Sequence, residues 1–263
     1  MRIVAILCAR NEIAYLKVVM PYLEQEGIEA ILIDNGSSDG TVEWATSGAA
    51  PAILHVEHLP FTGVFDLSAQ LAAKQAVVAR VSHDWVVHQD ADEILQAPTG
   101  WGGLRAHIER ADAAGYNTIN FQELVMLPFD PFVDDILANN RLCYYFDPRP
   151  LRLMRAWKRS ARLGNVESGG HVLGGADVLV YPEPMILKHF MVRSQAHAYQ
   201  KYLARSFASA DLARGWHGNR LNFTSDNLKL PRPSPALQVL TSARETPSPL
   251  PPSTKRHFWE WGL

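Results

Sequence analysis

The stretch IVAILCARNE, residues 3–12, begins with an uninterrupted apolar run at 3–8 and ends in three polar residues. Further short apolar runs follow at 30–33, 53–56 and 85–87. Continuous rather than alternating apolar runs are typical of strands in a parallel sheet that is covered on both faces. These runs therefore predict an α/β fold with a mostly parallel, Rossmann-like central sheet flanked by helices.

Amphipathic segments lie between the predicted strands. Residues 13–26 place apolar side chains on one helical face, and we expect Pro21 to kink or restart this helix and Gly27 to end it. Residues 42–45 and 67–81 predict the next two helices. The alternation of strand and helix predicts β-α units with right-handed connections.

The pattern becomes more mixed beyond residue 95. Residues 194–212 predict a helix, and the strand candidates in this part of the chain are 118–127, 151–157, 177–181 and 185–190. We interpret these elements as additions to the first half, which gives one domain at 1–220 with a first half at 1–95 and a second half at 96–220.

The C-terminal part differs in composition. Seven of the chain's 17 prolines fall between 231 and 252, which favours a tail or linker over a packed core. We therefore assign residues 221–263 to a proline-rich tail. Its aromatic end, FWEW at 258–261, is expected to pack back on its own domain.

Composition and charge exclude several classes of protein. The chain has 263 residues, of which 47% are hydrophobic and 20% charged, so wholesale disorder is excluded. The formal net charge of -2 makes nucleic acid a poor partner. The two cysteines, Cys8 and Cys143, lack C-x-x-C spacing and fit a reducing compartment.

The same composition bears on location. Polar residues from Arg10 onward cut the first apolar run short, which favours a buried strand over a signal peptide. No apolar stretch approaches the about 18 residues needed to span a bilayer. We expect a cytoplasmic protein whose membrane contact is at most peripheral, at the inner membrane.

Polar residues follow three of the predicted strands. They are Ala9-Arg10-Asn11-Glu12, the stretch 34–41 (DNGSSDGT) and the stretch 89–93 (QDADE). Ligands of open parallel sheets bind at the carboxyl ends of the strands, so the three loops are expected to converge on one crevice. Taken singly, each loop also fits a helix start, a glycine turn or a solvated turn.

Together, these three loops resemble those of the family 2 glycosyltransferases, which have the GT-A fold. The resemblance covers about residues 1–207 and is strongest up to Leu95; later, Lys188-His189-Phe190 and Arg193-Ser194 resemble a motif of some bacterial members. It implies transfer of a sugar from a nucleotide diphosphate donor, usually with inversion and a divalent cation. Roles in cell-envelope polysaccharide synthesis are typical of such enzymes.

The resemblance also implies which residues bind the donor. Uridine is the commonest base in the family, although Asn35 stands where many relatives carry a second aspartate. Positive charge beside the departing diphosphate is expected from Arg193, with Lys201 as a further candidate. The implied donor-binding residues are Ala9, Arg10, Asn11, Glu12, Asp34, Asn35, Lys74, Asp90, Ala91 and Arg193. The alternative for Lys74 is an exposed helical lysine.

Paired aspartates suit the metal chemistry of this reaction. A cation bridging both phosphates stabilises the negative charge that develops as the sugar leaves. Asp90 and Asp92 are two residues apart at a strand end, so that Asp92 can reach the metal while Asp90 contacts ribose or metal-bound water. Mn2+ or Mg2+ is expected, with His189 as a third ligand or, alternatively, a partly buried histidine bonded to backbone. The spacing does not fit an EF-hand, because Leu95 replaces its glycine.

Inversion requires a base that takes the proton of the acceptor hydroxyl. The polar, glycine-containing segment 165–171 (NVESGGH) offers Glu167 as the first candidate. His171 is an alternative base, acceptor contact or plain loop residue, and Asp177 and Glu183 remain further alternatives.

The leading hypothesis is therefore a metal-dependent inverting glycosyltransferase that acts on a saccharide, lipid-linked or peptide acceptor. A non-catalytic module that binds nucleotide sugars or carbohydrate is the alternative from a different class. A sugar nucleotidyltransferase is less consistent with the sequence, because no glycine-rich phosphate loop follows the first strand.

Overall fold

The computed structural model describes residues 1–247 and 251–261. Its contacts divide the chain into two compact units. The first unit comprises Met1–Thr62, Asp66–Phe121 and Leu151–Ile186. The second comprises Gly63–Phe65, Gln122–Pro150 and Leu187–Leu263. Both units are discontinuous in sequence, which differs from the halves expected on either side of residue 95.

The first unit is built on four parallel strands. They are β1 (Ile3–Ala9), β2 (Glu29–Asp34), β3 (Ile53–His58) and β4 (Trp85–Gln89), in the order β4-β1-β2-β3. In register, Leu7 pairs with Gln89 and Ala9 with Asp34, so the three strands end at one edge of the sheet. The four apolar runs of the first hundred residues are thus all strands, and the expected α/β class is confirmed.

Antiparallel strands extend this sheet beyond β4. Strand β8 (Leu153–Lys158) runs antiparallel to β4, and the beginning of β6 (Thr118–Leu127) runs antiparallel to β8. The expected strand at 177–181 contributes only a bridge between Thr118 and Val180. The mixed pattern seen in the sequence beyond residue 95 reflects this change of direction.

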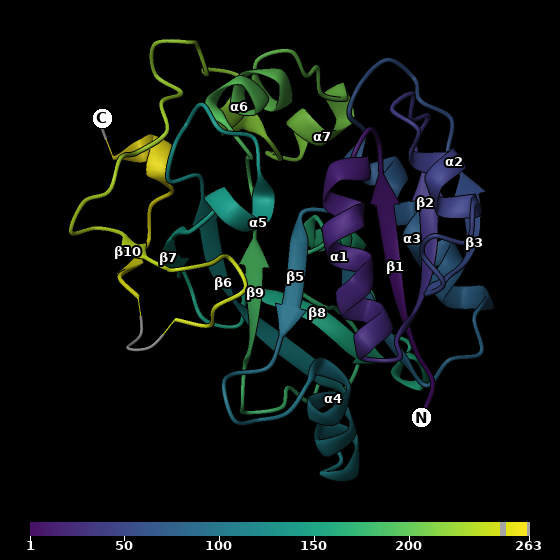
Figure 1. Cartoon of the computed structure of the whole chain (residues 1–263). Helices are drawn as coiled ribbons and strands as arrows, with labels where there is room; N and C mark the ends of the chain where they lie inside the picture. The colour runs from purple at the N-terminus through teal and green to yellow at the C-terminus, as the bar shows by residue number, and fades with distance from the viewer. Residues whose placement is uncertain (248–250, 262–263) are drawn as a thin grey trace. The chain divides into compact units, whose positions relative to one another are not determined.

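The helices of the first unit are α1 (Ile13–Gln25), α2 (Thr41–Thr46), α3 (Leu67–Arg80) and α4 (Leu104–Ala113). Helix α1 continues through Pro21 rather than restarting there. Figure 1 shows α1 in front of the β1–β2 pair and α3 behind it. Helix α4 lies in a segment for which the sequence analysis made no helix prediction.

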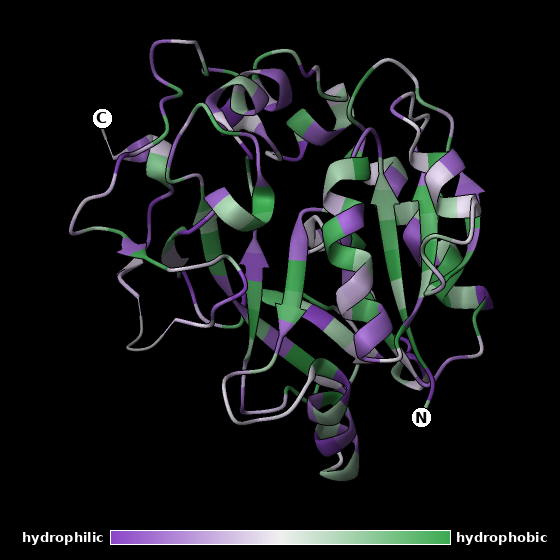
Figure 2. Ribbon diagram, in the orientation of Figure 1, coloured by the Kyte–Doolittle hydropathy of each residue, from purple (hydrophilic) through white to green (hydrophobic). Residues whose placement is uncertain are grey.

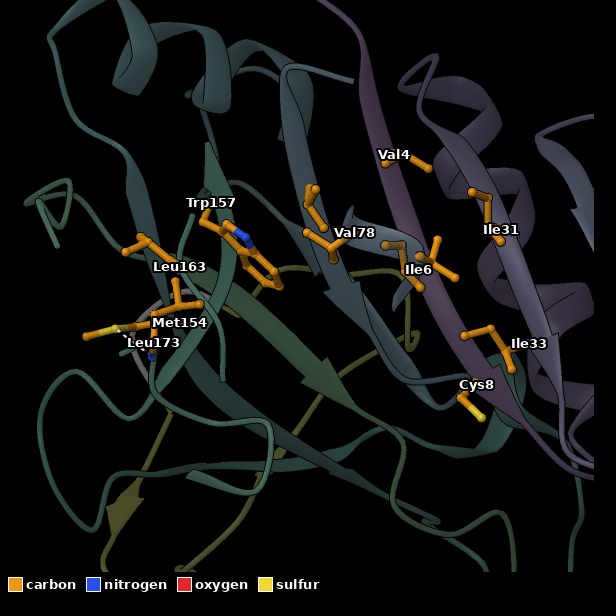
Figure 3. Close-up of a cluster of buried hydrophobic side chains, with 12 residues drawn as sticks. Val4, Ile6, Cys8, Ile31, Ile33, Val78, Met154, Trp157, Leu163 and Leu173 are labelled. Atoms are coloured by element: carbon orange, nitrogen blue, oxygen red, sulfur yellow. Dashed lines mark hydrogen bonds between the residues drawn. The ribbon is translucent and has the colours of Figure 1, made fainter. Parts of the chain in front are cut away.

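A hydrophobic core lies between one face of this sheet and α3. Alternate residues of β1 (Val4, Ile6 and Cys8) point into it, as period-2 geometry requires. Figure 3 shows these side chains with Val78 of α3 and Trp157 of β8. Strands β1 and β2 are almost uniformly hydrophobic (Figure 2). Burying one large apolar side chain stabilises the folded state by roughly 1.5–3 kcal/mol. This core therefore holds the strands in place, and with them the polar loops at the strand ends.

The second unit is organised around strand β7 (Leu142–Phe146). The end of β6 and the short β10 (Gln238–Val239) pair with it antiparallel, and β11 (Ser253–Thr254) pairs with it parallel. Strand β9 (Met185–His189) pairs with β5 (Glu93–Gln96) and with β6.

The remaining elements of the fold are three short helices and four 3-10 turns. They are α5 (Ile136–Asn139), α6 (Gln195–Tyr202), α7 (Ser209–Ala213), η1 (Arg159–Ala161), η2 (Val166–Ser168), η3 (Gly218–Arg220) and η4 (Phe258–Glu260).

Two expectations for this part of the chain are corrected. The helix expected at 194–212 is two helices, α6 and α7. The described part of 221–263 is not an unpacked tail, because Leu228, Leu230, Leu237 and Phe258 are buried in a hydrophobic cluster. Apolar residues between the prolines supply this burial, and proline is tolerated because the paired stretches are only two residues long. Residues 248–250 lie outside the described part.

The aromatic residues of the C-terminus pack within the second unit. The ring centroids of Tyr144 and Trp261 are 4.9 Å apart, and His257 stacks on both Phe146 and Trp259. Among the helices of the described ranges, none has the length and apolar character needed to cross a membrane.

Candidate active site

The loops after β1 and β2 are locked to each other by Asn11. This residue has a φ of +58°, in the left-handed region that asparagine tolerates better than most residues. Its backbone N–H donates to Ser37 Oγ at 2.9 Å, and its Oδ1 accepts from the Ser38 N–H at 2.7 Å. The carbonyl of Ala9 accepts from the Asn35 N–H at 2.8 Å. Glu12 precedes α1 as its N-cap.

Asp34, at the end of β2, is a buried carboxylate that organises its own loop. It is 4% exposed and accepts from the backbone N–H groups of Gly36 and Ser37 at 3.1 and 3.2 Å. These bonds compensate the cost of burying the carboxylate. Asp34 is one of the residues implied to bind the donor, and both of its carboxylate oxygens accept hydrogen bonds from its own loop.

The contacts of Asn35 explain why an amide rather than a second carboxylate follows Asp34. Its Nδ2 donates to the carbonyls of Leu59 and Pro60 at 3.0 and 3.3 Å. An aspartate would place a carboxylate against two carbonyl oxygens. Asn35, one of the residues implied to bind the donor, consequently holds the loop after β3 through its amide N–H groups.

That loop carries an aromatic partner for Arg10. The guanidinium carbon of Arg10 lies 3.6 Å from the centre of the Phe61 ring, and Phe61 is 38% exposed. The Nε of Arg10 is buried without a hydrogen-bond partner. Gly36, with a φ of +72°, allows this approach, since an added Cβ would lie 2.9 Å from the Phe61 Cβ. The arrangement presents a stacked cation with unused hydrogen-bonding capacity.

Two buried cations bind the carboxylate of Asp90, which follows β4. Lys74 Nζ lies 2.9 Å from Oδ1, and Arg155 Nη2 lies 3.1 Å from Oδ2. Burial alone would raise the pKa of Asp90, but the charges of Lys74 and Arg155 outweigh it and hold the pKa well below its usual value. Asp90 is therefore ionised across the physiological range.

Arg155 also fixes the rest of the acidic motif. Its guanidinium donates to Glu93 Oε1 at 2.7 Å, and Glu93 Oε2 accepts from the Asp90 N–H at 3.1 Å. Burial would lower the pKa of Arg155, but Glu93, Asp90 and Asp92 together raise it. Asp92 is 9% exposed, and Ala91 between the aspartates is buried. The acidic motif is thus a turn whose carboxylates are held by the positive charges of Lys74 and Arg155.

Lys74 has a different role from both of those expected for it. It is 5% exposed, so it is not a solvated helical lysine. Its three donors are used by His88 Nε2 at 2.8 Å, the Gln89 carbonyl at 3.0 Å and Asp90. Lys74 therefore holds Asp90 rather than contacting a donor directly.

The segment 165–171 forms a tight loop around Ser168. Ser168 Oγ donates its single proton to the Val172 carbonyl at 2.7 Å, lies 3.0 Å from the Asn165 carbonyl, and accepts from the N–H groups of His171 and Val172. Glu167 is exposed. Burial, with the charges of Arg155 and Arg152, lowers the pKa of His171 to about 3, so its imidazole is neutral at physiological pH and resists protonation. The alternative carboxylates Asp177 and Glu183 are both exposed.

The later candidates lie in the second unit. His189 Nδ1 pairs with Glu123 Oε1 at 2.5 Å, Arg193 pairs with Asp134 at 2.9 Å, and Lys201 donates to the Met191 carbonyl at 2.9 Å. One partner of His189 is thus a carboxylate.

Among the residues described, no three or more histidine, cysteine, aspartate or glutamate side chains form a group that could hold a metal ion. Of the expected metal ligands, Asp90 and Asp92 lie in the first unit and His189 in the second.

Sequence reasoning missed Arg155, His88, Asn165 and Phe61. A signal existed for Arg155, because a charged residue stands inside the otherwise apolar strand LMRAWK at Leu153–Lys158. Asn165 and Phe61 carried no comparable signal, since their contacts join segments far apart in the chain.

A protein-family model described as "Glycosyl transferase family 2" matches residues 4–123. No curated protein sequence matches the chain. Similar solved structures include S. aureus TarS, at 12% identity and a TM-score of 0.46, covering 88% of this chain and 46% of that one. The chain thus spans less than half the length of that protein.

Two further structures are similar at lower scores. TarS 1–349 with UDP-GlcNAc has 11% identity and a TM-score of 0.44, covering 88% of this chain and 77% of that chain. Glucosyl-3-phosphoglycerate synthase from Mycobacterium tuberculosis, in complex with Mn2+, UDP and glucosyl-3-phosphoglycerate, has 18% identity and a TM-score of 0.35, covering 61% and 57%.

Proposed function

We propose that this chain, a family 2 glycosyltransferase over residues 4–123, moves a sugar from a UDP-linked donor to a saccharide, lipid-linked or peptide acceptor. The observation that carries the proposal is the acidic motif after β4, held rigid by Lys74 and Arg155. The register of β1 with β2 and β4 brings this motif to the same sheet edge as Arg10 and Asp34. Sheet edges of this kind are where α/β proteins bind nucleotides.

Recognition of the nucleotide is assigned to the loops after β1, β2 and β3. The guanidinium of Arg10, stacked on Phe61, has donors but no acceptors and suits the carbonyl oxygens of uracil or the phosphates. Asn11, Asp34 and Asn35 act by fixing these loops, as their contacts to backbone groups indicate. A prearranged loop loses less entropy when it binds.

Metal use is proposed for the aspartates. Carboxylate oxygen suits Mg2+ or Mn2+, which commonly takes one or two protein carboxylates and completes its shell with phosphate and water. Asp92 would hold the ion, and Asp90 would face ribose or water because its two oxygens already face Lys74 and Arg155. When bound, such an ion stabilises negative charge on the departing diphosphate.

Inversion is proposed with a base from the segment 165–171. His171 is neutral at physiological pH, but a pKa of about 3 makes its imidazole a weak base. Glu167, which is exposed, is therefore the first candidate for the base, and His171 is the alternative. Replacing each residue separately by alanine distinguishes them, because loss of transfer with unchanged UDP binding is expected for the base alone.

Calorimetry with UDP, with and without Mn2+, tests the function together with an assay of donor turnover. Metal-linked binding of UDP and release of UDP from a UDP-sugar support the enzyme. Binding without turnover over a wide acceptor panel supports the non-catalytic module instead. The absence of any nucleotide binding contradicts both.

A further inference from the structure

Buried contacts connect Asp90 to the segment 165–171 along two separate routes. The first route runs from Asp90 Oδ1 to Lys74 and from Lys74 to His88 Nε2, with distances of 2.9 and 2.8 Å. His88 Nδ1 then lies 2.9 Å from Asn165 Nδ2. His88 is 4% and Asn165 4% exposed, so water does not compete for these contacts.

The second route runs through Arg155. Its Nη2 donates to Asp90 Oδ2 at 3.1 Å, and its Nη1 donates to the Gly170 carbonyl at 3.2 Å. The same carbonyl accepts from Asn165 Nδ2 at 3.1 Å. The two routes therefore close into a ring of contacts: Asp90, Lys74, His88, Asn165, the Gly170 carbonyl, Arg155 and back to Asp90. Because a neutral imidazole accepts at only one nitrogen, and Nε2 accepts from Lys74, the contact between His88 Nδ1 and Asn165 Nδ2 is one of packing rather than a hydrogen bond.

Strand pairing and a glycine bring the members of the ring close to one another. Val87 of β4 pairs with Ala156 of β8, which brings His88 level with Arg155. Gly170 has a φ of +86°, and an added Cβ would lie 3.2 Å from His88 Cε1. A side chain at this position would push the loop off the imidazole. Buried polar contacts of this kind rigidify their surroundings, because removing one member leaves its hydrogen-bond partners unsatisfied.

We infer that His88 and Asn165 are positioning residues, which hold the loop of His171 and Glu167 in register with Asp90 and the acidic motif. This inference rests on the proposed function, because it assigns the ring to aligning the acceptor side of the reaction with the donor side. Neither residue is assigned a contact with substrate. Their effect on the reaction is exerted through the position of the loop.

Amide hydrogen exchange tests the ring without any substrate. The reporters are the Gly170 N–H, bonded to the Asn165 carbonyl at 2.8 Å, and the Glu93 N–H, bonded to the Asp90 carbonyl at 3.2 Å. Asn165→Ala is expected to speed exchange at least tenfold at both ends, in 169–172 and in 90–93. Unchanged exchange in 90–93 would overturn the inference.

Two substitutions of His88 cut the links separately. The amide of His88→Gln reaches the position of Nε2 and keeps the contact to Lys74, whereas that of His88→Asn reaches Nδ1 and keeps the contact to Asn165. We expect exchange to rise mainly in 169–172 for His88→Gln and mainly in 90–93 for His88→Asn. The matched control is Asn117→Ala, which removes the bonds to the Asp177 carbonyl and the Leu179 N–H and touches no member of the ring. Equal patterns in both His88 variants and in the control contradict the inference.

Turnover links the ring to the reaction. For Asn165→Ala, assayed below its unfolding transition with the UDP-sugar that the wild type uses, kcat is expected to fall at least tenfold while the donor KM stays within threefold. Unchanged kcat, or a change confined to the donor KM, overturns the positioning role. If the wild type neither binds UDP nor turns over, the proposed function fails, whereas the exchange results still report on the ring itself.

Discussion

Lys74 and Asp90 form an ion pair of 2.9 Å in which the lysine side chain is 7% exposed and the aspartate side chain 43% exposed. The buried Lys74 thus holds the carboxylate of Asp90, whose side chain is partly exposed to solvent. Since the carboxylate is oriented before any ligand arrives, no reorganisation is required when it binds. This relationship, more than the presence of two aspartates, distinguishes the motif from a solvated acidic turn.

Asp92→Ala is expected to lower sugar transfer or donor hydrolysis at least about a hundredfold, as loss of a group that stabilises developing charge generally does. Asp84 is a matched control, because it lies before β4 at the opposite end of the same strand, where it accepts from the Arg2 N–H. The measurement is the rate of UDP release at saturating donor, with thermal unfolding recorded for both variants. Full activity of Asp92→Ala with an intact fold would refute the assignment of the site.

Arg155→Met is expected to lower the free energy of unfolding by about 3–5 kcal/mol, because it removes the buried cation that pairs with Glu93 and leaves Lys74 as the remaining cation beside the ionised Asp90. Arg149→Met, at an exposed position, is the control and should change it by less than about 0.5 kcal/mol. Urea denaturation followed by circular dichroism gives both values. A loss below about 1 kcal/mol for Arg155→Met would show that the network is not fixed by this residue.

Phe61→Ala is expected to weaken UDP binding roughly fivefold to tenfold, since a cation–π contact contributes about 1 kcal/mol and here orients Arg10. Phe61→Tyr keeps an aromatic ring and should bind UDP as the wild type does. Phe132, which is 85% exposed, provides a control phenylalanine. Calorimetric titration with UDP is the measurement, and equal affinities for Phe61→Ala and Phe132→Ala would contradict the role of Phe61.

His171 makes the stability of the protein sensitive to acid. Its pKa is lowered to about 3 by burial and by Arg155 and Arg152, whereas an unfolded histidine titrates near its ordinary 6.5. Between these values the unfolded state binds more protons, so the free energy of unfolding falls as the pH is lowered through that window. The slope contributed by one such group is up to about 1.4 kcal/mol per pH unit.

His171→Asn should therefore show a shallower fall of stability between about pH 6 and 4.5, measured by urea denaturation at each pH. His55→Asn replaces an exposed histidine and serves as the comparison. Identical slopes for the wild type and His171→Asn would show that this group is not the acid-sensitive one.

Lys188→Met is expected to loosen the C-terminal part of the second unit. The buried ammonium donates to the carbonyls of Ala243, Arg244 and Glu245 at 3.0, 3.2 and 2.8 Å, and removing it leaves these acceptors without their donor. A loss of about 2–3 kcal/mol is expected in the free energy of unfolding. Limited proteolysis should cut the variant faster near 241–247 than it cuts the wild type or Lys229→Met, and equal rates would contradict the prediction.

The local pattern of the chain was enough for the first half of the fold. The apolar runs at β1, β2 and β4 depend only on neighbouring residues, because strands buried on both faces are apolar along almost their whole length. Strand β3 (ILHVEH) lies at the end of the strand order and has no buried residue. The loops that follow them are equally local, so the residues at the sheet edge could be located from the sequence. Burial between the prolines was not visible in the same way, and 221–263 was therefore misjudged.

The tertiary structure decided what those residues do. Asn35, Lys74 and Asp90 were each found in the sequence, but their partners Leu59, His88 and Arg155 come from other segments, up to 65 residues away. Hydrogen bonding and ion pairing act over about 3 Å in space and carry no fixed spacing along a chain. The amino-acid sequence thus determined which polar groups reach the edge of the sheet, whereas only the folded packing decided which of them are anchored by buried partners and which remain available to a ligand.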